Sequence, residues 1–338
     1  MQNSHTTADL RGIHSVGGGV AWASGTNGTV LRTEDGGYLW QVCAIPPGAE
    51  HLDFRGIQAF DANTAIVMSS GKGDLSRLYK TTDGCHSWKL IFTNPDIDGF
   101  WDAISAKEQK VVILGDPTAG EFVLEMSSDG GATWKREKLP PSQDGEGAFA
   151  ASNTSLAYEW EDGVALFGTG GPNGARLFVG CVPCTSKQPA KSWTVRPVDF
   201  FGAGAASGIF SLGGYHTKSG SLFLAVGGDY SKPDQQGAAA VTRNLMTWQP
   251  AQTPPHGYRS AVAYDAQTKT WITVGPNGTD ISTDDGRNWH AIHPDPTLRQ
   301  PPDADKNWNA LSLPFVVGPH GRVGKLHEQA RGRQAERH

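Results

Sequence analysis

Short apolar segments alternate with clusters of Gly, Asn, Asp and Ser along most of the chain. In one representative stretch, FRGIQAF, TAIVMSS, SRLYKTT and WKLIF follow one another, each separated from the next by such a cluster. Runs of this length, rich in β-branched and aromatic residues, predict short strands, and the clusters between them predict tight turns. Helical periodicity is nearly absent before Lys325. The pattern therefore predicts an all-β protein.

A motif of the form [ST]-x-D-x-[GC]-x-x-W recurs along the chain. Four copies occupy Thr33–Trp40, Thr81–Trp88, Ser127–Trp134 and Ser282–Trp289, and weaker versions end at Trp193 and Trp248. The six tryptophans are 48, 46, 59, 55 and 41 residues apart. A period of about 40–50 residues with a tryptophan signature is typical of a propeller, in which each repeat forms one four-stranded blade.

The repeat predicts a seven-bladed β-propeller of four-stranded antiparallel blades, with six blades as the alternative. The last unit stops one strand short, so we expect residues 1–8 to supply the missing strand and close the ring, which removes exposed sheet edges. We expect a single domain over 1–326 and a flexible tail over 327–338. The predicted blades cover approximately 10–46, 53–95, 99–140, 147–198, 208–252, 257–296, and 308–326 with 1–8.

The motif itself predicts a structural turn between the third and fourth strands of a blade. A short carboxylate in a turn accepts hydrogen bonds from backbone N–H groups a few residues on, and the tryptophan ring packs beside the turn. A catalytic role for Asp129 is the alternative, but four near-identical copies cannot all be one active site. The structural assignment covers Asp35, Trp40, Asp83, Trp88, Asp129, Trp134, Asp284 and Trp289.

Composition and charge exclude several classes of function. The chain has 338 residues with a formal net charge of −5, which argues against nucleic acid as a partner. No run of about 18 apolar residues is present, so no membrane span is expected. The first residues, MQNSHTTADL, lack the apolar core of a signal peptide. No zinc-protease, paired-cysteine zinc or phosphate-loop motif occurs, and we expect neither a metal nor a cofactor.

The four cysteines carry little functional signal. Cys181 and Cys184 form a CxxC pair for which a local disulfide or inert loop thiols are favoured over a redox or metal role. Cys43 and Cys85 each lie beside a tryptophan-bearing strand, and we interpret them as packing residues.

Alignment of the predicted innermost strands gives one equivalent channel-facing position per blade. These positions are Arg11, Arg55, Asp102, Phe149, Phe210, Arg259 and Asn309, each followed by a small residue. Because the sixth, seventh, first and second blades are neighbours, Arg259, Asn309, Arg11 and Arg55 would form an arc that ends at Asp102. Guanidinium groups in a confined channel favour recognition of an anion. The alternative is that each arginine pairs with a carboxylate such as Asp53 or Asp102 and ties blades together.

Further candidates lie beside these positions. The loops between second and third strands carry Asp116, Asp229 and Tyr230 and should open on the same face. Tyr258 and Trp308 precede two of the channel-facing positions, and Trp101 precedes a third. Glu159 and Trp160 are expected to begin a second strand. Such aromatic residues pack between blades more often than they contact ligands.

The repeated motif resembles the Asp-box, or BNR repeat, of sialidase-like propellers. An ordered set of segments is similar more narrowly to the photosystem II stability/assembly factor-like proteins. It comprises LRGIHSV, GTVLRTEDGGYLW, GDPTAGEF, GIFSLGG, VGGDYSKPD, YRSAVAY, VGPNGTDISTDDG and GRVGKL, which together cover residues 10–326. This resemblance implies a secreted or periplasmic, monomeric, non-catalytic propeller that binds a protein partner or an anionic small molecule or glycan.

The enzyme alternative is a sialidase-like glycoside hydrolase, which would use Tyr258, Glu159 and Asp102 as its catalytic groups. One observation weakens it. The Phe-Arg-Ile-Pro signature of sialidases corresponds to Phe54-Arg55-Gly56-Ile57 here, and the similar Leu10-Arg11-Gly12-Ile13 indicates an inner-strand repeat. The sequence therefore favours a binding function.

Overall fold

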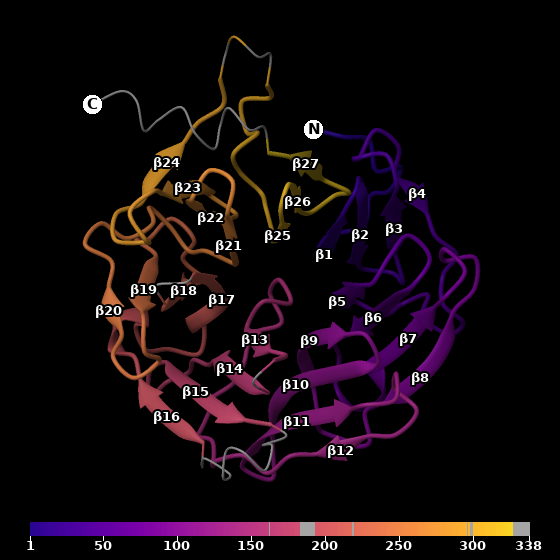
Figure 1. Cartoon of the computed structure of the whole chain (residues 1–338), viewed down its shortest axis with the longest axis horizontal. Coiled ribbons are helices and arrows are strands. Elements are labelled where there is room, and N and C mark those ends of the chain that lie inside the picture. The colour runs from indigo at the N-terminus through magenta and orange to yellow at the C-terminus, as the bar shows by residue number, and fades with distance from the viewer. Residues whose placement is uncertain (162, 183–192, 218–219, 296, 298–299, 327–338) are drawn as a thin grey trace.

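Seven antiparallel sheets are arranged in a ring in the computed structural model (Figure 1), which confirms the predicted all-β, seven-bladed propeller. The structure describes residues 1–161, 163–182, 193–217, 220–295, 297 and 300–326. The described chain contains no α-helix, and its complete 3₁₀ turns are η1 (Gly73–Leu75) and η2 (Asp199–Phe201). No helix of the described chain has the length and apolar character to cross a membrane.

The strands follow the chain around the ring, one blade after another. The first three blades contain β1 (Leu10–Gly17), β2 (Val20–Gly25), β3 (Val30–Thr33), β4 (Gln41–Val42); β5 (Phe54–Ala59), β6 (Ala65–Ser69), β7 (Arg77–Thr81), β8 (Lys89–Thr93); and β9 (Trp101–Lys107), β10 (Lys110–Thr118), β11 (Glu121–Ser127), β12 (Lys135–Arg136). Blades four and five contain β13 (Leu156–Glu159), β14 (Val164–Gly168), β15 (Arg176–Cys181), β16 (Thr194–Pro197); and β17 (Ser207–Thr217), β18 (Gly220–Asp229), β19 (Ala238–Thr242), β20 (Gln249–Pro250). The last two contain β21 (Ala261–Asp265), β22 (Thr270–Gly275), β23 (Gly278–Ser282), β24 (His290–Ile292); and β25 (Ala310–Ser312), β26 (Phe315–Val317), β27 (Val323–Lys325).

Within each blade the strands pair in sequence order, with the first strand innermost and the last at the outer rim (Figure 1). The seventh blade has three strands, and the N-terminal segment lies beside its outer strand, β27. The backbone N–H of Gln2 donates to the carbonyl of Val323 at 2.9 Å, and Gly321 donates to the carbonyl of Ala8 at 2.7 Å. The start of the chain therefore closes the ring, through an isolated bridge at Gln2 instead of the full strand expected over residues 1–8.

The four motif turns share one hydrogen-bond pattern. In the third copy the Ser127 hydroxyl donates to Asp129 Oδ1 at 2.8 Å, and the same oxygen accepts from the backbone N–H groups of Ala132 and Thr133 at 3.0 and 2.9 Å. The Thr133 hydroxyl and these backbone donors hold the pKa of Asp129 down to about 2. These are the local bonds that the sequence predicts for the turn. The Asp129 carboxylate is therefore satisfied by the turn itself and needs no ligand.

Strand register places the motif turns far from the channel mouth. In the first blade Thr33, which begins the motif, pairs with Ala21 near the start of β2, whereas Leu10 at the start of β1 pairs with Gly25 at the end of β2. The motif and the channel-facing Arg11 thus lie at opposite ends of the same blade. The motif sets the register, and the candidate ligand site lies elsewhere.

The fourth blade departs from the predicted alignment. Its inner strand β13 begins at Leu156, so Phe149 lies outside any strand, although the prediction placed it on one. Residues 148–155, here called the channel-crossing segment, run from this blade across the centre of the ring. The segment contains the polar sequence SNTS. Side chains of this sequence form hydrogen bonds in place of the backbone ladder of a strand.

The channel-crossing segment is tied to distant blades. Ile104 in β9 donates its backbone N–H to Asn153 Oδ1 at 2.7 Å. The Ser152 hydroxyl donates to the carbonyl of Ser260 at the sixth blade, 2.6 Å away. Asn153 adopts a φ of +66°, a conformation that asparagine tolerates better than most residues. The segment therefore joins the third blade to the sixth, and its first four residues line the cavity at the channel mouth.

The cysteines correct a second prediction. Cys43 and Cys85 form a disulfide with Cα atoms 5.4 Å apart, so they are a crosslink and not only packing residues. The bond joins the residue after the outer strand β4 of the first blade to the motif turn of the second. The CxxC pair reaches into residues 183–192, and Cys184 and the tail at 327–338 lie outside the described residues.

Loss of this disulfide should destabilise the ring. The bond closes a sequence separation of 42 residues, for which chain entropy predicts about 2–4 kcal/mol. We expect the Cys43→Ser/Cys85→Ser variant to unfold at lower temperature and lower denaturant concentration than the oxidised wild type. Dithiothreitol should shift the wild type and leave the variant unchanged. Equal stability of the oxidised wild type, the reduced wild type and the variant would contradict this expectation.

Candidate functional site: the mouth of the central channel

A cavity of about 520 Å³ lies at the mouth of the channel, bounded by the starts of the inner strands. Of the seven positions aligned from the sequence, six line it and Arg259 does not. Tyr258, Trp308 and Asp116 also line it, as do residues that the sequence did not single out. The lining comprises Arg11, Arg55, Phe100, Asp102, Asp116, Ala148, Phe149, Ala150, Ala151, Phe210, Tyr230, Tyr258, Ser260, Pro276, Trp308 and Asn309.

Two arginines from neighbouring blades share one carboxylate. Arg11 Nε lies 3.1 Å from Asp53 Oδ1, and Arg55 Nε lies 2.8 Å from Asp53 Oδ2. Arg55 Nη1 also donates to the carbonyl of Ala150 in the channel-crossing segment at 3.3 Å. The side chains of both arginines remain 29% exposed. The carboxylate pairing that the sequence offered as the alternative therefore exists. Because two guanidiniums share one carboxylate, the three groups together keep a positive charge at the cavity wall.

The glycines that follow these arginines allow the first three blades to approach one another. A Cβ on Gly12 would lie 3.0 Å from the carbonyl oxygen of Arg55, and one on Gly56 would lie 2.8 Å from the side chain of Ile104. Gly12 thus lies against the second blade and Gly56 against the third, at distances too short for a larger residue. The small residues predicted from the sequence therefore set the spacing that brings Arg11 and Arg55 together.

Asp102 and Asp116 form an acidic pair on the third blade. Asp102 is 1% exposed, and its Oδ2 has no hydrogen-bond partner within the described chain. Burial, together with the neighbouring Asp116, raises the pKa of Asp102 well above its usual range, although Arg55 acts to lower it. Burial raises the pKa of Asp116 to about 6, and Asp116 Oδ1 accepts from the N–H of Ala148 at 2.9 Å. Burial and the neighbouring carboxyl group therefore disfavour the ionised form of Asp102 when no cation is present.

Aromatic rings from the fourth, fifth and sixth blades form another wall of the cavity. Phe149 and Phe210 stack with their centroids 3.8 Å apart. Tyr258 and Tyr230 approach Phe210 edge-on, at 4.7 and 6.0 Å. Tyr230 is 53% exposed, so part of this wall is open to solvent. Burial raises the pKa of the Tyr258 phenol, which disfavours its ionised form.

The structure contradicts the predicted position of Arg259. Its side chain is fully buried and turns away from the cavity to meet Asp280, which is 1% exposed. Arg259 Nε donates to Asp280 Oδ2 at 2.7 Å, and Nη1 donates to Asn277 Oδ1 at 2.6 Å. His256 Nδ1 completes the group, 2.7 Å from Asp280 Oδ1. Asp280 on the buried strand β23 was the sequence signal for this network, because a carboxylate there requires a partner.

Three other predicted residues are placed as follows. Glu159 ends the inner strand β13 instead of beginning a second strand, and it pairs with His216 at 3.2 Å, away from the cavity lining. Asp229 ends β18 and accepts hydrogen bonds from Ser231, and it is not among the lining residues. Asn309 lines the cavity and donates to the carbonyl of Leu10 at 2.8 Å, joining the seventh blade to the first. The catalytic trio Tyr258, Glu159 and Asp102 is therefore not assembled.

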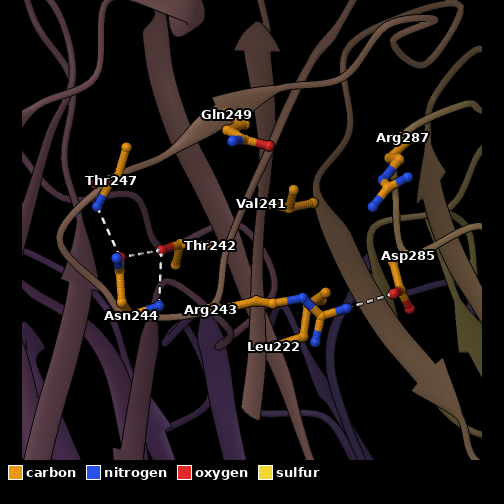
Figure 2. A pocket seen from close by; sticks show the side chains of 9 residues that line it. All are labelled: Leu222, Val241, Thr242, Arg243, Asn244, Thr247, Gln249, Asp285 and Arg287. Carbon is orange, nitrogen blue, oxygen red and sulfur yellow. Dashed lines mark hydrogen bonds and ion pairs between the residues drawn. The ribbon is translucent and has the colours of Figure 1, made fainter. Parts of the chain in front are cut away.

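A smaller cavity of about 180 Å³ lies between the outer parts of the fifth and sixth blades. Figure 2 shows Arg243 extended toward Asp285, and the two side chains form an ion pair at 2.7 Å. Arg243 is 58% exposed. This surface contains none of the predicted ligand-binding residues, and it offers a matched control for the arginines of the channel mouth.

The fold and site together define a seven-bladed propeller with a polar, aromatic-lined cavity at its channel mouth. No protein-family model matches the chain, and no curated protein does so either. Among solved structures, YCF48 bound to D1 peptide is similar at 16% identity and a TM-score of 0.63, covering 96% of this chain and 95% of that one. YCF48 from Cyanidioschyzon merolae is similar at 19% identity and a TM-score of 0.63, covering 96% and 97%.

An enzyme also shares the architecture. The GH74 xyloglucanase from Xanthomonas campestris is similar at 16% identity and a TM-score of 0.61, covering 94% of this chain and 52% of that one. These structural neighbours are consistent with the family resemblance seen in the sequence. At such identities the likeness establishes the fold.

Proposed function

We propose that this protein is a non-catalytic binding propeller that recognises a protein partner or an anionic ligand at the channel mouth through Arg11 and Arg55. One observation carries the proposal. Both guanidiniums line a cavity of about 520 Å³ and have one carboxylate, Asp53, between them. Arg259, which the sequence assigned to the same role, belongs to the buried network instead.

The chemistry of the two arginines fits an anion. Each engages Asp53 through Nε, and within the described chain the terminal amino groups of Arg11 form no hydrogen bond, so they can donate to a ligand. A planar guanidinium presents several donors in a fixed geometry and binds carboxylate, sulfate or phosphate in a bidentate manner. The ion pairs with Asp53 also hold the first two blades together. The same ion pairs orient the side chains of Arg11 and Arg55 and leave them able to bind a ligand.

A peptide segment of another protein is the form of anion that we favour. The structurally similar YCF48 is described as bound to a D1 peptide. A cavity of this volume, with an open aromatic wall beside the arginines, suits a carboxylate carried on a short stretch of chain. We further propose that the protein works outside the cytoplasm, because disulfides such as Cys43–Cys85 persist in oxidising compartments.

A glycoside hydrolase is the second candidate function. Asp102 and Asp116 place two carboxyl groups in one cavity, and a GH74 enzyme shares the fold. Turnover of a fluorogenic glycoside that is lost in Asp116→Asn would support hydrolysis. If the protein only binds, neither wild type nor Asp116→Asn should turn over the glycoside.

A peptide-display selection tests the binding proposal. We expect wild type to enrich peptides that contain acidic residues, and the Arg11→Ala/Arg55→Ala variant to lose at least tenfold in affinity for them, because each charge-assisted hydrogen bond contributes roughly 1.5–3 kcal/mol. Fluorescence polarisation with a selected peptide measures the change. The Arg243→Ala variant, which removes an exposed arginine outside the cavity, should bind as wild type does. Equal binding by all three proteins would contradict the proposal.

A further inference from the structure

We propose that the same cavity contains a subsite for an ammonium group, formed by Asp116 with the rings of Phe149, Phe210 and Tyr230. This inference rests on the proposed function and deepens it. The ligand would carry a carboxylate for Arg11 and Arg55 and, at some distance along its chain, an amine such as a lysine side chain. The cavity would thus recognise a dipolar segment instead of a simple anion.

The first observation is a pair of carboxyl groups that lacks a full complement of partners. Asp102 is 1% exposed, lines the cavity, and has an oxygen without a hydrogen-bond donor in the described chain. The neighbouring Asp116 is partly buried and lines the same cavity, and one of its oxygens accepts from the N–H of Ala148. Burial without a cation disfavours the ionised form of such a carboxyl group, and a ligand ammonium would stabilise that form.

The second observation is the aromatic wall next to Asp116. Ala148 donates to Asp116, and the following residue, Phe149, stacks on Phe210 at 3.8 Å. Tyr230 meets Phe210 edge-on at 6.0 Å and is 53% exposed. Aromatic faces attract cations through their quadrupole, and rings combined with a carboxylate are the usual surroundings of a bound ammonium. The rings and Asp116 therefore indicate the same ligand group.

The third observation is the distribution of charge around the cavity. Arg11 and Arg55 lie on the first and second blades, Asp102 and Asp116 on the third, and the aromatic rings on the fourth and fifth. A ligand with one anionic and one cationic group would match the two charged walls. The described chain places no group of three metal-ligating side chains here or elsewhere, so a metal ion is not the cation that we infer.

Flexible probes of graded length test the inference, because the separation of the two ligand groups is open. The probes are ω-amino acids from 5-aminopentanoate to 8-aminooctanoate, each compared with the plain carboxylate of the same chain length. We expect the best ω-amino acid to bind wild type at least tenfold more tightly than its matched carboxylate at pH 7.5, measured by titration calorimetry or NMR. The Asp116→Asn variant, which keeps the acceptor for Ala148, should lose this preference.

The pH dependence supplies a second readout. The pKa of Asp116 is about 6, and an ammonium binds its ionised form, so the preference should fall as the pH falls through 6 and should be lost at pH 5. The other charged or titratable groups facing the cavity are Arg11, Arg55, Asp102 and the two tyrosines, Tyr230 and Tyr258. The probe amine stays protonated throughout this range. A neutral acid that donates to the ligand would give the opposite dependence.

Each outcome separates the two proposals. If the plain carboxylates bind as tightly as the ω-amino acids and Arg11→Ala/Arg55→Ala abolishes both, the ammonium subsite is wrong and the anion site stands. A preference that persists in Asp116→Asn, or that rises at pH 5, also overturns the subsite. If no probe binds and no acidic peptide is selected by display, both proposals fail.

Discussion

Replacing Asp280 with asparagine is expected to lower the free energy of unfolding by about 3–5 kcal/mol. Asp280 is 1% exposed and pairs with the fully buried Arg259 through two nitrogens of the guanidinium. Burial lowers the pKa of Arg259 and Asp280 acts to raise it, but a guanidinium stays charged in proteins, so this buried charge depends on the carboxylate for its compensation. The variant leaves a buried guanidinium without its counter-charge. Chemical denaturation of wild type and Asp280→Asn measures the difference.

The ion pair of Arg243 with Asp285 is the control for this experiment. Its side chains are 58% and 35% exposed, and solvent-exposed pairs contribute about 0–1 kcal/mol. Asp285→Asn should therefore change the free energy of unfolding by less than 1 kcal/mol, while the Tyr215 hydroxyl can still donate to the amide oxygen. If Asp280→Asn and Asp285→Asn lost similar amounts of unfolding free energy, burial would not explain the contribution of the Arg259–Asp280 pair to stability.

Replacing Trp40 with alanine should also cost about 3–5 kcal/mol. Trp40 is 1% exposed and packs edge-on against Phe315 of the seventh blade, with centroids 5.6 Å apart. Its indole N–H donates to Gln2 Oε1 at 2.9 Å, and Gln2 is the residue that bridges to β27. One side chain therefore joins the first blade, the seventh blade and the N-terminal segment. Its loss leaves a cavity where the ring closes.

The tryptophan of the third motif is the matched comparison. Trp134 holds the same position in its repeat but is only partly buried, and its indole N–H donates locally to the carbonyl of Gly131. Trp134→Ala should cost about half as much, because less apolar area returns to water. Calorimetric unfolding of the two variants gives the comparison. A larger loss for Trp134→Ala would contradict the account of closure at Trp40.

Most of the architecture follows from the spacing of the tryptophans and the turn motif. The repeat predicts seven blades, with six as the alternative, and it predicts the strand register, which places Arg11, Arg55, Asp102 and Asn309 at one end of the ring. These features are local, because each blade is a chain of hairpins between near neighbours in sequence. The motif turn around Asp129 is predictable for the same reason: its hydrogen bonds join residues no more than four positions apart.

The departures from prediction involve contacts between distant residues. Arg259 occupies the aligned position, yet Asp280 and Asn277 draw its side chain into the interior, and alignment cannot show in which direction a side chain turns. The channel-crossing segment leaves its blade because its partners, Ile104 and Ser260, belong to other blades. The disulfide joins cysteines in adjacent repeats. Each depends on how blades pack together, which a single-repeat pattern does not encode.

A crystal soaked in selenate tests most directly whether the channel mouth binds an anion. We expect an anomalous selenium peak for a selenate ion whose oxygens accept hydrogen bonds from the guanidiniums of both Arg11 and Arg55, and no peak there in the Arg11→Ala/Arg55→Ala variant. Selenate bound only at exposed arginines such as Arg243, with Arg11 and Arg55 still paired with Asp53 alone, would contradict it.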